Sequence, residues 1–311
     1  MKFLISRRQV LVVANVAFVV FALVHEAAAQ TVALTFDDGP KLEETPIFSP
    51  LQRNQRILEA LAKHHVKAAL FVTADNGASR PEGYAFAKAW GLSGHAVGNH
   101  TMTHPDLNNQ KLTLEQYQEE ILDCDKIIKT LPGYQKWFRY TYLREGNTPE
   151  KRDGVRSFLS QQGYRNAYVS LDTSDWRFND KLTEILSKNP RADITPIKQL
   201  YLAHIQQRAL AYRQLSQQLQ GRDIPHVMLL HHNLTSALWL DDVMTQFEKM
   251  GWKFVSPTDA YADPVYQLKP ELPATGQSML LSMARSLGMG NFAGRQRLID
   301  DADFEMAELK E

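Results

Sequence analysis

The sequence predicts an α/β fold built on a parallel sheet, and three observations support this prediction. The chain has 311 residues, of which 44% are hydrophobic, so it can bury a large core. From Thr31 onward, short apolar runs alternate with longer amphipathic runs, a pattern typical of parallel strands joined by helices. The seven strand candidates favour an incomplete barrel over an open sheet of six strands.

The strand candidates are short runs of apolar and β-branched residues. They cover residues 32–36, 68–72, 96–98, 137–140, 167–171, 227–230 and 253–255. The helix candidates cover residues 50–64, 113–130, 148–163, 195–219 and 237–250. Pro50 occupies a first-turn position that favours proline, and Thr113 with Gln116 has the pattern of a capping box. Gly163 and Gly251 are expected to end two of these helices.

The first 29 residues have the composition of a secretory signal peptide. Basic residues at positions 2, 7 and 8 precede an apolar run over residues 10–24, and small residues at 27–29 predict cleavage after Ala29. The run has 15 residues, fewer than the roughly 20 that span a bilayer, although an uncleaved anchor is an alternative. The segment around Arg7 and Arg8 also resembles a twin-arginine export signal. We therefore expect an exported protein, periplasmic or secreted, with no membrane contact after cleavage.

The rest of the chain is expected to form one domain over residues 30–262, followed by a C-terminal extension over residues 263–311. Within the extension, residues 280–287 have the pattern of a short amphipathic helix. Basic and acidic residues are equal in number, 35 each, which argues against a nucleic-acid partner held by bulk charge. The single cysteine, Cys124, excludes an intrachain disulfide and a multi-cysteine zinc site. The oligomeric state stays open.

Polar residues capable of catalysis follow five of the seven strand candidates. They are Asp37 and Asp38, the segment Asn99–His104, Arg139, Asp172 and Asp175, and His231. Ligand sites in parallel α/β folds form beyond the C-terminal ends of the strands. The placement of these polar residues at the ends of predicted strands therefore predicts a catalytic cleft.

His100 and His104 are four residues apart, so one helical turn would put both side chains on one side. With a carboxylate from a neighbouring strand end, they would form a two-histidine, one-carboxylate face. Such a face binds a divalent metal and leaves positions for water and substrate. Alternatively, a pair with this spacing caps a helix or lies on the surface.

Asp37 and Asp38 are adjacent, so in an extended strand their side chains would point to opposite faces. At a twisted strand end both can reach one pocket, where one carboxylate binds a metal and the other accepts a proton from metal-bound water. The sequence Asp-Asp-Gly-Pro is also typical of a turn. A turn is compatible with such a site.

Taken together, these segments resemble the polysaccharide deacetylase family, which is the NodB-homology domain of carbohydrate esterase family 4. The first family motif, T-F-D-D-G-P, is intact over Thr35–Pro40, and the second, H-[ST]-x-x-H, is intact over His100–His104. The third motif, R-x-P-Y, is present only in part over Arg139–Tyr142. The fourth and fifth match Asp172–Trp176 and Leu229–His231. The resemblance covers most of the chain after the predicted signal peptide.

This resemblance implies a distorted (β/α)7 barrel whose catalytic domain holds one divalent metal ion, commonly Zn²⁺. Asp38, His100 and His104 would bind the metal. Asp37 would be the general base. Arg139 would keep the Asp37 carboxylate ionised and oriented, because an adjacent cation lowers a carboxyl pKa.

The resemblance also implies a proton donor and an oxyanion contact. His231 would be the general acid that protonates the leaving amine, and Asp175 would keep the pKa of His231 high enough for that step. The backbone N–H of Tyr142 would stabilise the oxyanion, and Trp176 would line the pocket. Thr141 replaces the proline of the third motif, a departure that bears on the shape of the Tyr142 loop.

The function predicted in this way is metal-dependent removal of N-acetyl groups from an amino-sugar polysaccharide or oligosaccharide that is peptidoglycan- or chitin-like. The partner would be an acetylated glycan. Hydrolysis of O-acetyl esters on xylan or another exopolysaccharide would use the same site, whereas cyclic-imide or ureide hydrolysis suits an exported protein less well. A carbohydrate-binding protein that keeps the fold without turnover is the alternative from another class.

Overall fold

The computed structural model describes residues 30–272, 276–292, 295–299 and 301–309. The predicted signal peptide over residues 1–29 lies outside the described residues. Within the described ranges, no helix combines the length and the apolar character needed to cross a membrane.

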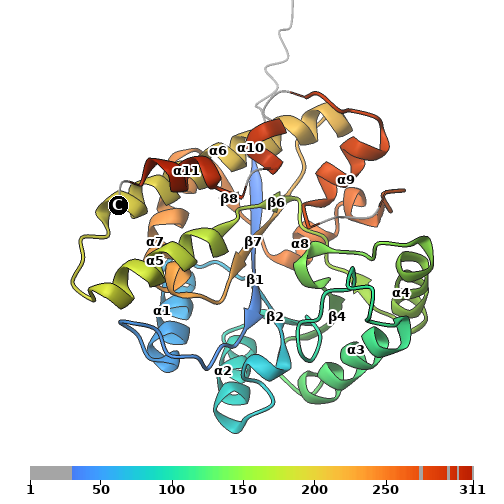
Figure 1. Cartoon of the computed structure of the whole chain (residues 1–311), viewed down its shortest axis with the longest axis horizontal. Helices are drawn as coiled ribbons and strands as arrows, with labels where there is room; N and C mark the ends of the chain where they lie inside the picture. The colour runs from blue at the N-terminus through green and yellow to red at the C-terminus, as the bar shows by residue number, and fades with distance from the viewer. Residues whose placement is uncertain (1–29, 273–275, 293–294, 300, 310–311) are drawn as a thin grey trace, which may run out of the picture.

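A parallel sheet forms the centre of the molecule (Figure 1). Among the described residues its eight strands are β1 (Thr31–Gly39), β2 (Ala69–Val72), β3 (Ala96–Asn99), β4 (Tyr134–Phe138), β5 (Arg165–Asn166), β6 (Leu171–Asp172), β7 (His226–His231) and β8 (Lys253–Phe254). The strand order is β5-β4-β3-β2-β1-β7-β6, and β8 pairs with the start of β1. Because neighbouring strands of this sheet run parallel, the C-terminal ends of the strands meet at one edge, where ligand sites form.

The sheet is an incomplete barrel, as the sequence predicts. β5 and β6 are the two ends of the strand order, and residues 167–170 cross from one edge to the other. Ala167 donates its N–H to the Phe138 carbonyl on β4 (2.7 Å), and Ser170 donates its N–H to the Val227 carbonyl on β7 (3.1 Å). The prediction of one strand over residues 167–171 is therefore wrong, because the backbone groups of this segment pair with two different strands.

Helices surround the sheet (Figure 1). Before the C-terminal segment they are α1 (Pro50–Lys63), α2 (Pro81–Leu92), α3 (Leu114–Ile128), α4 (Pro149–Gln161), α5 (Asp175–Lys188), α6 (Thr195–Gln220) and α7 (Leu234–Lys249). Pro50 starts α1, and the capping box of Thr113 and Gln116 starts α3, both as predicted. α2 and α5 lie outside the predicted helix ranges.

The C-terminal segment that follows β8 packs against the barrel. It contains α8 (Pro257–Tyr261), α9 (Met279–Ser286), α10 (Arg295–Ile299) and α11 (Asp303–Glu308). Met279, Leu280 and Leu281 of α9 are buried. The Met279 N–H donates to the Val169 carbonyl (2.8 Å) in the segment between β5 and β6. α10 lies beside α6 (Figure 1), so this segment belongs to the packed structure around the site.

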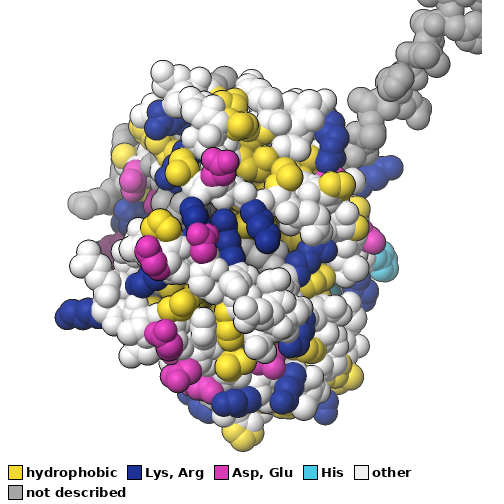
Figure 2. All heavy atoms as spheres, turned by 90° about the vertical axis from the view of Figure 1, so that its right-hand side faces the viewer, with side chains coloured by type: hydrophobic (Ala, Val, Ile, Leu, Met, Phe, Trp, Pro, Cys, Tyr) yellow, Lys and Arg dark blue, Asp and Glu magenta, His cyan; other side chains and the backbone are white. Residues whose placement is uncertain are grey.

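The side of the molecule that carries α3, α4 and α9 shows basic side chains gathered near its middle, with acidic side chains among them (Figure 2). On α4, Arg152 contacts Asp153 (2.7 Å) and Arg156 contacts the buried Glu145 (2.5 Å). This pairing of opposite charges agrees with the balanced composition of the chain.

Candidate active site

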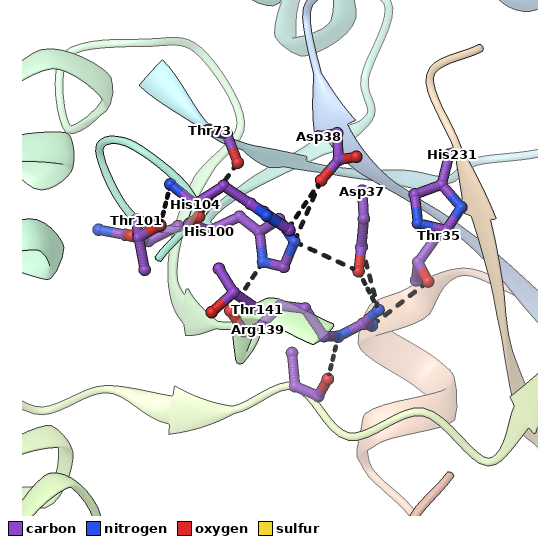
Figure 3. Close-up of polar contacts among 12 residues, drawn as sticks. Thr35, Asp37, Asp38, Thr73, His100, Thr101, His104, Arg139, Thr141 and His231 are labelled. Carbon is purple, nitrogen blue, oxygen red and sulfur yellow. Dashed lines mark hydrogen bonds and ion pairs between the residues drawn. The ribbon is translucent and has the colours of Figure 1, made fainter. Parts of the chain in front are cut away.

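The C-terminal end of β1 places Asp37 and Asp38 in one cavity. The pairing of β1 with β2 shifts its register between Phe36 and Gly39. Asp38 also has a left-handed backbone, with φ of 64°, which is uncommon for a residue other than glycine. This local irregularity breaks the alternation of side chains along the strand, so both carboxylates face the same site (Figure 3).

Asp38, His100 and His104 converge in that site. One ligand atom from each residue lies within 4.8 Å of the other two. Asp38 Oδ1 is 3.1 Å from His104 Nε2 and 3.5 Å from His100 Nε2, yet this buried oxygen has no hydrogen-bond partner among the described residues. Burying an unpaired carboxylate oxygen is costly. A divalent cation held by these three side chains would satisfy it.

The position of His100 determines which of its nitrogens can bind a metal. Nδ1 lies 2.8 Å from the Arg139 carbonyl oxygen. Because a carbonyl only accepts hydrogen bonds, Nδ1 carries the proton and Nε2 is left with its lone pair toward Asp38. Metal-binding histidines commonly donate their other N–H to a carbonyl in this way. Two imidazoles and one carboxylate therefore fit a divalent metal such as zinc.

His100 and His104 lie in a loop and not on a helical turn, which corrects the expectation from their spacing. Thr101 and His104 both have left-handed backbones, with φ of 71° and 62°. Asn99 Oδ1 accepts the Thr101 N–H (2.9 Å), and Thr101 Oγ1 accepts the His104 N–H (3.0 Å). Hydrogen bonds from backbone N–H groups to the side chains of Asn99 and Thr101 therefore determine the shape of this loop. A helical turn would use bonds between backbone groups.

The carboxylate of Asp37 is held by the guanidinium of Arg139, and both side chains are almost fully buried. Arg139 Nη1 donates to Asp37 Oδ1 (3.0 Å) and Oδ2 (3.1 Å), and Nε donates to the Ala167 carbonyl (2.6 Å). Burial alone would lower the pKa of Arg139, but the Asp37 carboxylate and the Tyr261 hydroxyl together outweigh burial and raise that pKa. Asp37 Oδ2 is 3.7 Å from His100 Nε2, so this carboxylate lies beside the candidate metal site.

Lys41 contacts the second oxygen of Asp38, with Nζ 3.1 Å from Oδ2. Burial alone would raise the pKa of the Asp38 carboxyl. The imidazoles of His100 and His104 and the Lys41 ammonium outweigh burial and hold that pKa well below its ordinary value. Asp38 is therefore ionised at neutral pH, as a metal ligand must be.

His231, at the end of β7, lines the same cavity and is paired with Asp175 at the start of α5. Its Nδ1 is 2.6 Å from Asp175 Oδ1. Burial alone would lower the pKa of His231, but the carboxylates of Asp175, Asp38 and Asp37 together outweigh burial and raise that pKa to about 9. His231 is therefore a cation at neutral pH.

Tyr142 and Trp176 lie at the rim of the cavity, which has a volume of about 450 Å³. Their side chains are 49% and 40% exposed. The Tyr142 ring lies edge-on to His104, with centroids 4.5 Å apart. Tyr142 also has a left-handed backbone, with φ of 56°, inside a tight turn. Two exposed aromatic rings at the opening suit a ligand with both apolar and polar faces.

Thr141 makes contacts that the proline of the third motif could not make. Its hydroxyl donates to the carbonyl of Pro105, the residue after His104. Thr141 Oγ1 is also 3.1 Å from the Tyr117 hydroxyl. Because the single Thr141 proton goes to the carbonyl, Tyr117 is the donor in the second contact. The first bond ties the turn of the third motif to the loop that carries His104, and the second ties it to α3.

Several cavity residues lie outside the set predicted from the sequence. They are Lys41, Leu143, Arg144, Asn179, Asp180, Leu229, Asn233, Gly276 and Asp301. Lys41 and Asn233 are a few residues from Asp38 and His231, so closeness to a motif could have identified them. Gly276 and Asp301 come from the C-terminal extension, where no sequence pattern indicates a site.

Comparisons with known proteins match this chain to deacetylases. The family model described as polysaccharide deacetylase matches residues 25–167. A peptidoglycan-N-acetylglucosamine deacetylase of Bacillus cereus is 34% identical over 147 residues, covering 47% of this chain and 46% of that protein. A chitooligosaccharide deacetylase of Sinorhizobium fredii is 36% identical over 148 residues, covering 48% of this chain and 60% of that protein. The chain thus spans about half the length of these relatives.

Solved structures show the same fold. A peptidoglycan N-acetylglucosamine deacetylase superposes with a TM-score of 0.50 at 26% identity, covering 74% of this chain and 87% of that chain. A CE4 family pseudoenzyme from Bacillus anthracis has a TM-score of 0.51 at 20% identity, covering 75% of this chain and 66% of that chain, and shows likeness of fold alone. The family match includes both intact motifs, with Asp37, Asp38, His100 and His104. Over residues 25–167 the chain is therefore similar to the polysaccharide deacetylase family.

Proposed function

We propose that the protein is a metal-dependent hydrolase that removes N-acetyl groups from an amino-sugar polysaccharide or oligosaccharide. One observation carries this proposal. The candidate metal ligands share a single cavity with a buried carboxylate, Asp37, and with a protonated imidazole, His231. The similarity to deacetylases of peptidoglycan and of chitooligosaccharides supports the substrate class.

The residues Asp38, His100 and His104 are the proposed metal ligands. A divalent metal at this place, which we propose to be Zn²⁺, would polarise the acetyl carbonyl and lower the pKa of water. Asp37 accepts the proton of the attacking water. Arg139 is the positioning residue for that step, because its bonds to both Asp37 oxygens hold the carboxylate in one orientation.

Proton donation to the leaving group falls to His231. Water adds to the acetyl carbon, the C–N bond breaks, and the amine leaves with a proton from His231 while acetate is released. Asp175 positions His231 and raises its pKa. The backbone N–H of Tyr142 stabilises the oxyanion, and Trp176 lines the pocket against the sugar.

The charge on His231 favours an amide substrate over an ester. An amine is a far poorer leaving group than an alcohol unless it is protonated, so amide hydrolysis depends strongly on a general acid. A pKa of about 9 keeps His231 in its acid form at neutral pH. O-acetyl ester hydrolysis would make less use of this arrangement.

The test is acetate release by the purified protein from N-acetylglucosamine oligomers, peptidoglycan and acetylxylan, with zinc supplied. We expect release from the first or second substrate at a higher kcat/KM than from acetylxylan. Preference for acetylxylan would make the protein an esterase. A metal-loaded protein that binds glycans without releasing acetate would be a carbohydrate-binding protein.

We also propose that residues 1–29 are a signal peptide, that residues 30–262 form the catalytic domain, and that residues 263–311 are an extension of it. The exported protein should then begin at Gln30, which N-terminal sequencing of the periplasmic or secreted fraction would test. A chain that begins at Met1 and sediments with membranes would contradict the cleavage.

A further inference from the structure

The two oxygens of the Asp38 carboxylate have different surroundings. Oδ1 lies 3.1 Å from His104 Nε2 and 3.5 Å from His100 Nε2 (Figure 3), and it has no hydrogen-bond partner among the described residues. Oδ2 lies 3.1 Å from Lys41 Nζ. Lysine has an ordinary pKa of about 10.4 and is therefore a cation at neutral pH. One oxygen of Asp38 thus faces the two imidazoles, and an ammonium group occupies the other.

Lys41 lines the cavity but is neither a candidate metal ligand nor one of the residues proposed to move a proton. Among the described residues its ammonium has one ion pair, the contact to Asp38. The side chain is 23% exposed, so water screens this contact less than it screens an ion pair on the surface. The contact is therefore directed at a single atom of the candidate metal site.

The main chain of Lys41 is held by Arg53 of α1. The Arg53 guanidinium is fully buried, and its Nη2 donates to the Lys41 carbonyl (2.5 Å). Its Nη1 donates to the Glu43 carbonyl (3.0 Å). Both carbonyls lie in the irregular segment that joins β1 to α1. A rigid donor from a helix thus fixes the course of this segment just after Asp38.

His232 holds the other side of the Lys41 peptide, because its Nδ1 accepts the Lys41 N–H (3.4 Å). The Asn54 oxygen accepts hydrogen bonds from Trp90 Nε1 (2.9 Å) and from His232 Nε2 (3.1 Å). Burial, with smaller contributions from Arg53 and Lys41, lowers the pKa of His232 to about 3. The ring is therefore neutral and can accept at Nδ1 while it donates at Nε2.

We propose that Lys41 is a positioning residue that presents only Oδ1 of Asp38 to the metal. Because the ammonium occupies Oδ2, the carboxylate does not use both oxygens on one cation, and a coordination position remains for water or for the acetyl oxygen. This inference rests on the proposed metal-dependent function. It extends that function by giving a role to a residue outside the ligands and the proton-transfer groups.

The charge of Lys41 should weaken metal binding and promote the reaction at the same time. A cation beside a ligand carboxylate repels the metal ion and so lowers its affinity. The same cation also reduces the negative charge that offsets the metal, which favours an oxyanion in the transition state. Loss of the charge should therefore change metal affinity and kcat in opposite senses, a result that a purely structural role would not produce.

Lys41→Met tests this role, because it removes the charge and keeps a side chain of similar length. We expect the dissociation constant for zinc, measured in competition with a chromophoric chelator, to become about ten-fold tighter. We expect kcat on an N-acetylglucosamine oligomer to fall about ten-fold, with KM unchanged. Weaker zinc binding together with a lower Tm would make Lys41 a purely structural residue and overturn the proposal. A raised KM with unchanged kcat would make Lys41 a substrate contact and overturn it as well.

The visible absorption of the cobalt-loaded protein provides a readout that does not depend on turnover. Absorption by Co²⁺ becomes weaker as its coordination number rises. If Lys41→Met leaves Oδ2 free to bind the metal as well, absorption per bound cobalt should decrease. Lys41→Arg keeps a cation at Oδ2 and should retain the wild-type spectrum and zinc dissociation constant. Identical spectra for the wild type and Lys41→Met would overturn the single-oxygen assignment.

The matched control is Lys181→Met. Lys181 lies on α5, contacts Glu184 (3.2 Å) and does not line the cavity. Its side chain is 30% exposed, close to the 23% of Lys41. The variant makes the same change in net charge, so zinc affinity, the cobalt spectrum and kcat should all stay unchanged. Equal shifts in the two variants would mean that overall charge sets the metal affinity, and would overturn the role of Lys41.

The two proposals fail in different ways. A wild-type protein that binds zinc but releases no acetate overturns the deacetylase function, and the zinc titrations and cobalt spectra still decide the role of Lys41. Acetate release with no change of zinc affinity in Lys41→Met overturns that role and leaves the function standing. A wild-type protein that binds neither zinc nor cobalt overturns both.

Discussion

Both oxygens of the Asp175 carboxylate contact His231. Oδ1 lies 2.6 Å from the ring Nδ1, and Oδ2 accepts the backbone N–H of the same residue at 2.9 Å. Asn233 Nδ2 donates to Oδ2 as well (3.0 Å). The buried carboxylate thus fixes the orientation of the ring and stabilises its protonated form. Nε2 is the ring nitrogen left to deliver a proton.

Asp175→Asn should move the alkaline limb of the activity profile to lower pH. The pKa of His231 is raised to about 9, so its acid form is present at neutral pH and is lost as pH rises through about 9. Without the carboxylate charge, that pKa should fall toward the ordinary value of about 6.5. The measurement is kcat/KM on an N-acetylglucosamine oligomer between about pH 5 and 10. If the alkaline limb of the variant stays at the same pH, a group other than His231 is responsible for that limb.

His231→Ala should reduce amide hydrolysis much more than hydrolysis of an activated aryl acetate. General acid catalysis contributes about 10²- to 10⁴-fold, and a phenolate leaves without needing a proton. Parallel kinetics on the two substrates provide the measurement. Equal losses on both would show that His231 does not act on the leaving group.

Asp37→Asn should keep the metal and lose turnover. The candidate ligand set does not include Asp37, so elemental analysis should still find about one metal per chain. Loss of the general base should reduce kcat by about 10²-fold or more. His104→Ala is the comparison, because it should lose metal and turnover together. Normal hydrolysis by Asp37→Asn would mean that the base is elsewhere.

Metal binding should stabilise the fold. A ligand at 100 times its dissociation constant adds about 2.7 kcal/mol to the free energy of unfolding, and here it would also satisfy the buried Asp38 Oδ1. Thermal unfolding with zinc and after treatment with a chelator would measure the shift in Tm. The shift should disappear in His104→Ala. An equal shift in that variant would place the stabilising metal at another site.

Thr141→Val should destabilise the protein and disturb the metal site. The change keeps the size of the side chain but leaves the Pro105 carbonyl and the Tyr117 hydroxyl without their shared partner. An unpaired buried polar group costs about 1–3 kcal/mol. Denaturant unfolding and zinc titration would measure both effects, with Thr141→Ser as the control that retains the hydroxyl. Unchanged zinc affinity in the valine variant would limit Thr141 to a structural role.

The chemistry-bearing positions could be predicted because they are short-range features of the sequence. Asp37 and Asp38 lie at the C-terminal end of β1, and His231 ends β7, so the topology of a parallel sheet brings them to one edge. The capping box at Thr113 is a local pattern of the same kind. Such features need only neighbouring residues to be recognised.

The remaining features depend on contacts between distant segments. Residues 167–170 have the composition of a strand, but their backbone groups bond to β4 and β7 in turn. The histidine loop takes its shape from the side chains of Asn99 and Thr101 and not from a helical period. Asp301 reaches the cavity through packing of the C-terminal helices, and no local pattern encodes that approach.

Arg139 serves two neighbours at once. Its guanidinium holds Asp37, and its carbonyl oxygen holds the ring of His100 at 2.8 Å. The first contact is made by the side chain and the second by the main chain of the same residue. A laboratory evolution campaign that replaces this arginine would remove the guanidinium from Asp37 while the main-chain acceptor of His100 stays in place, so the two contacts can be altered separately at this position.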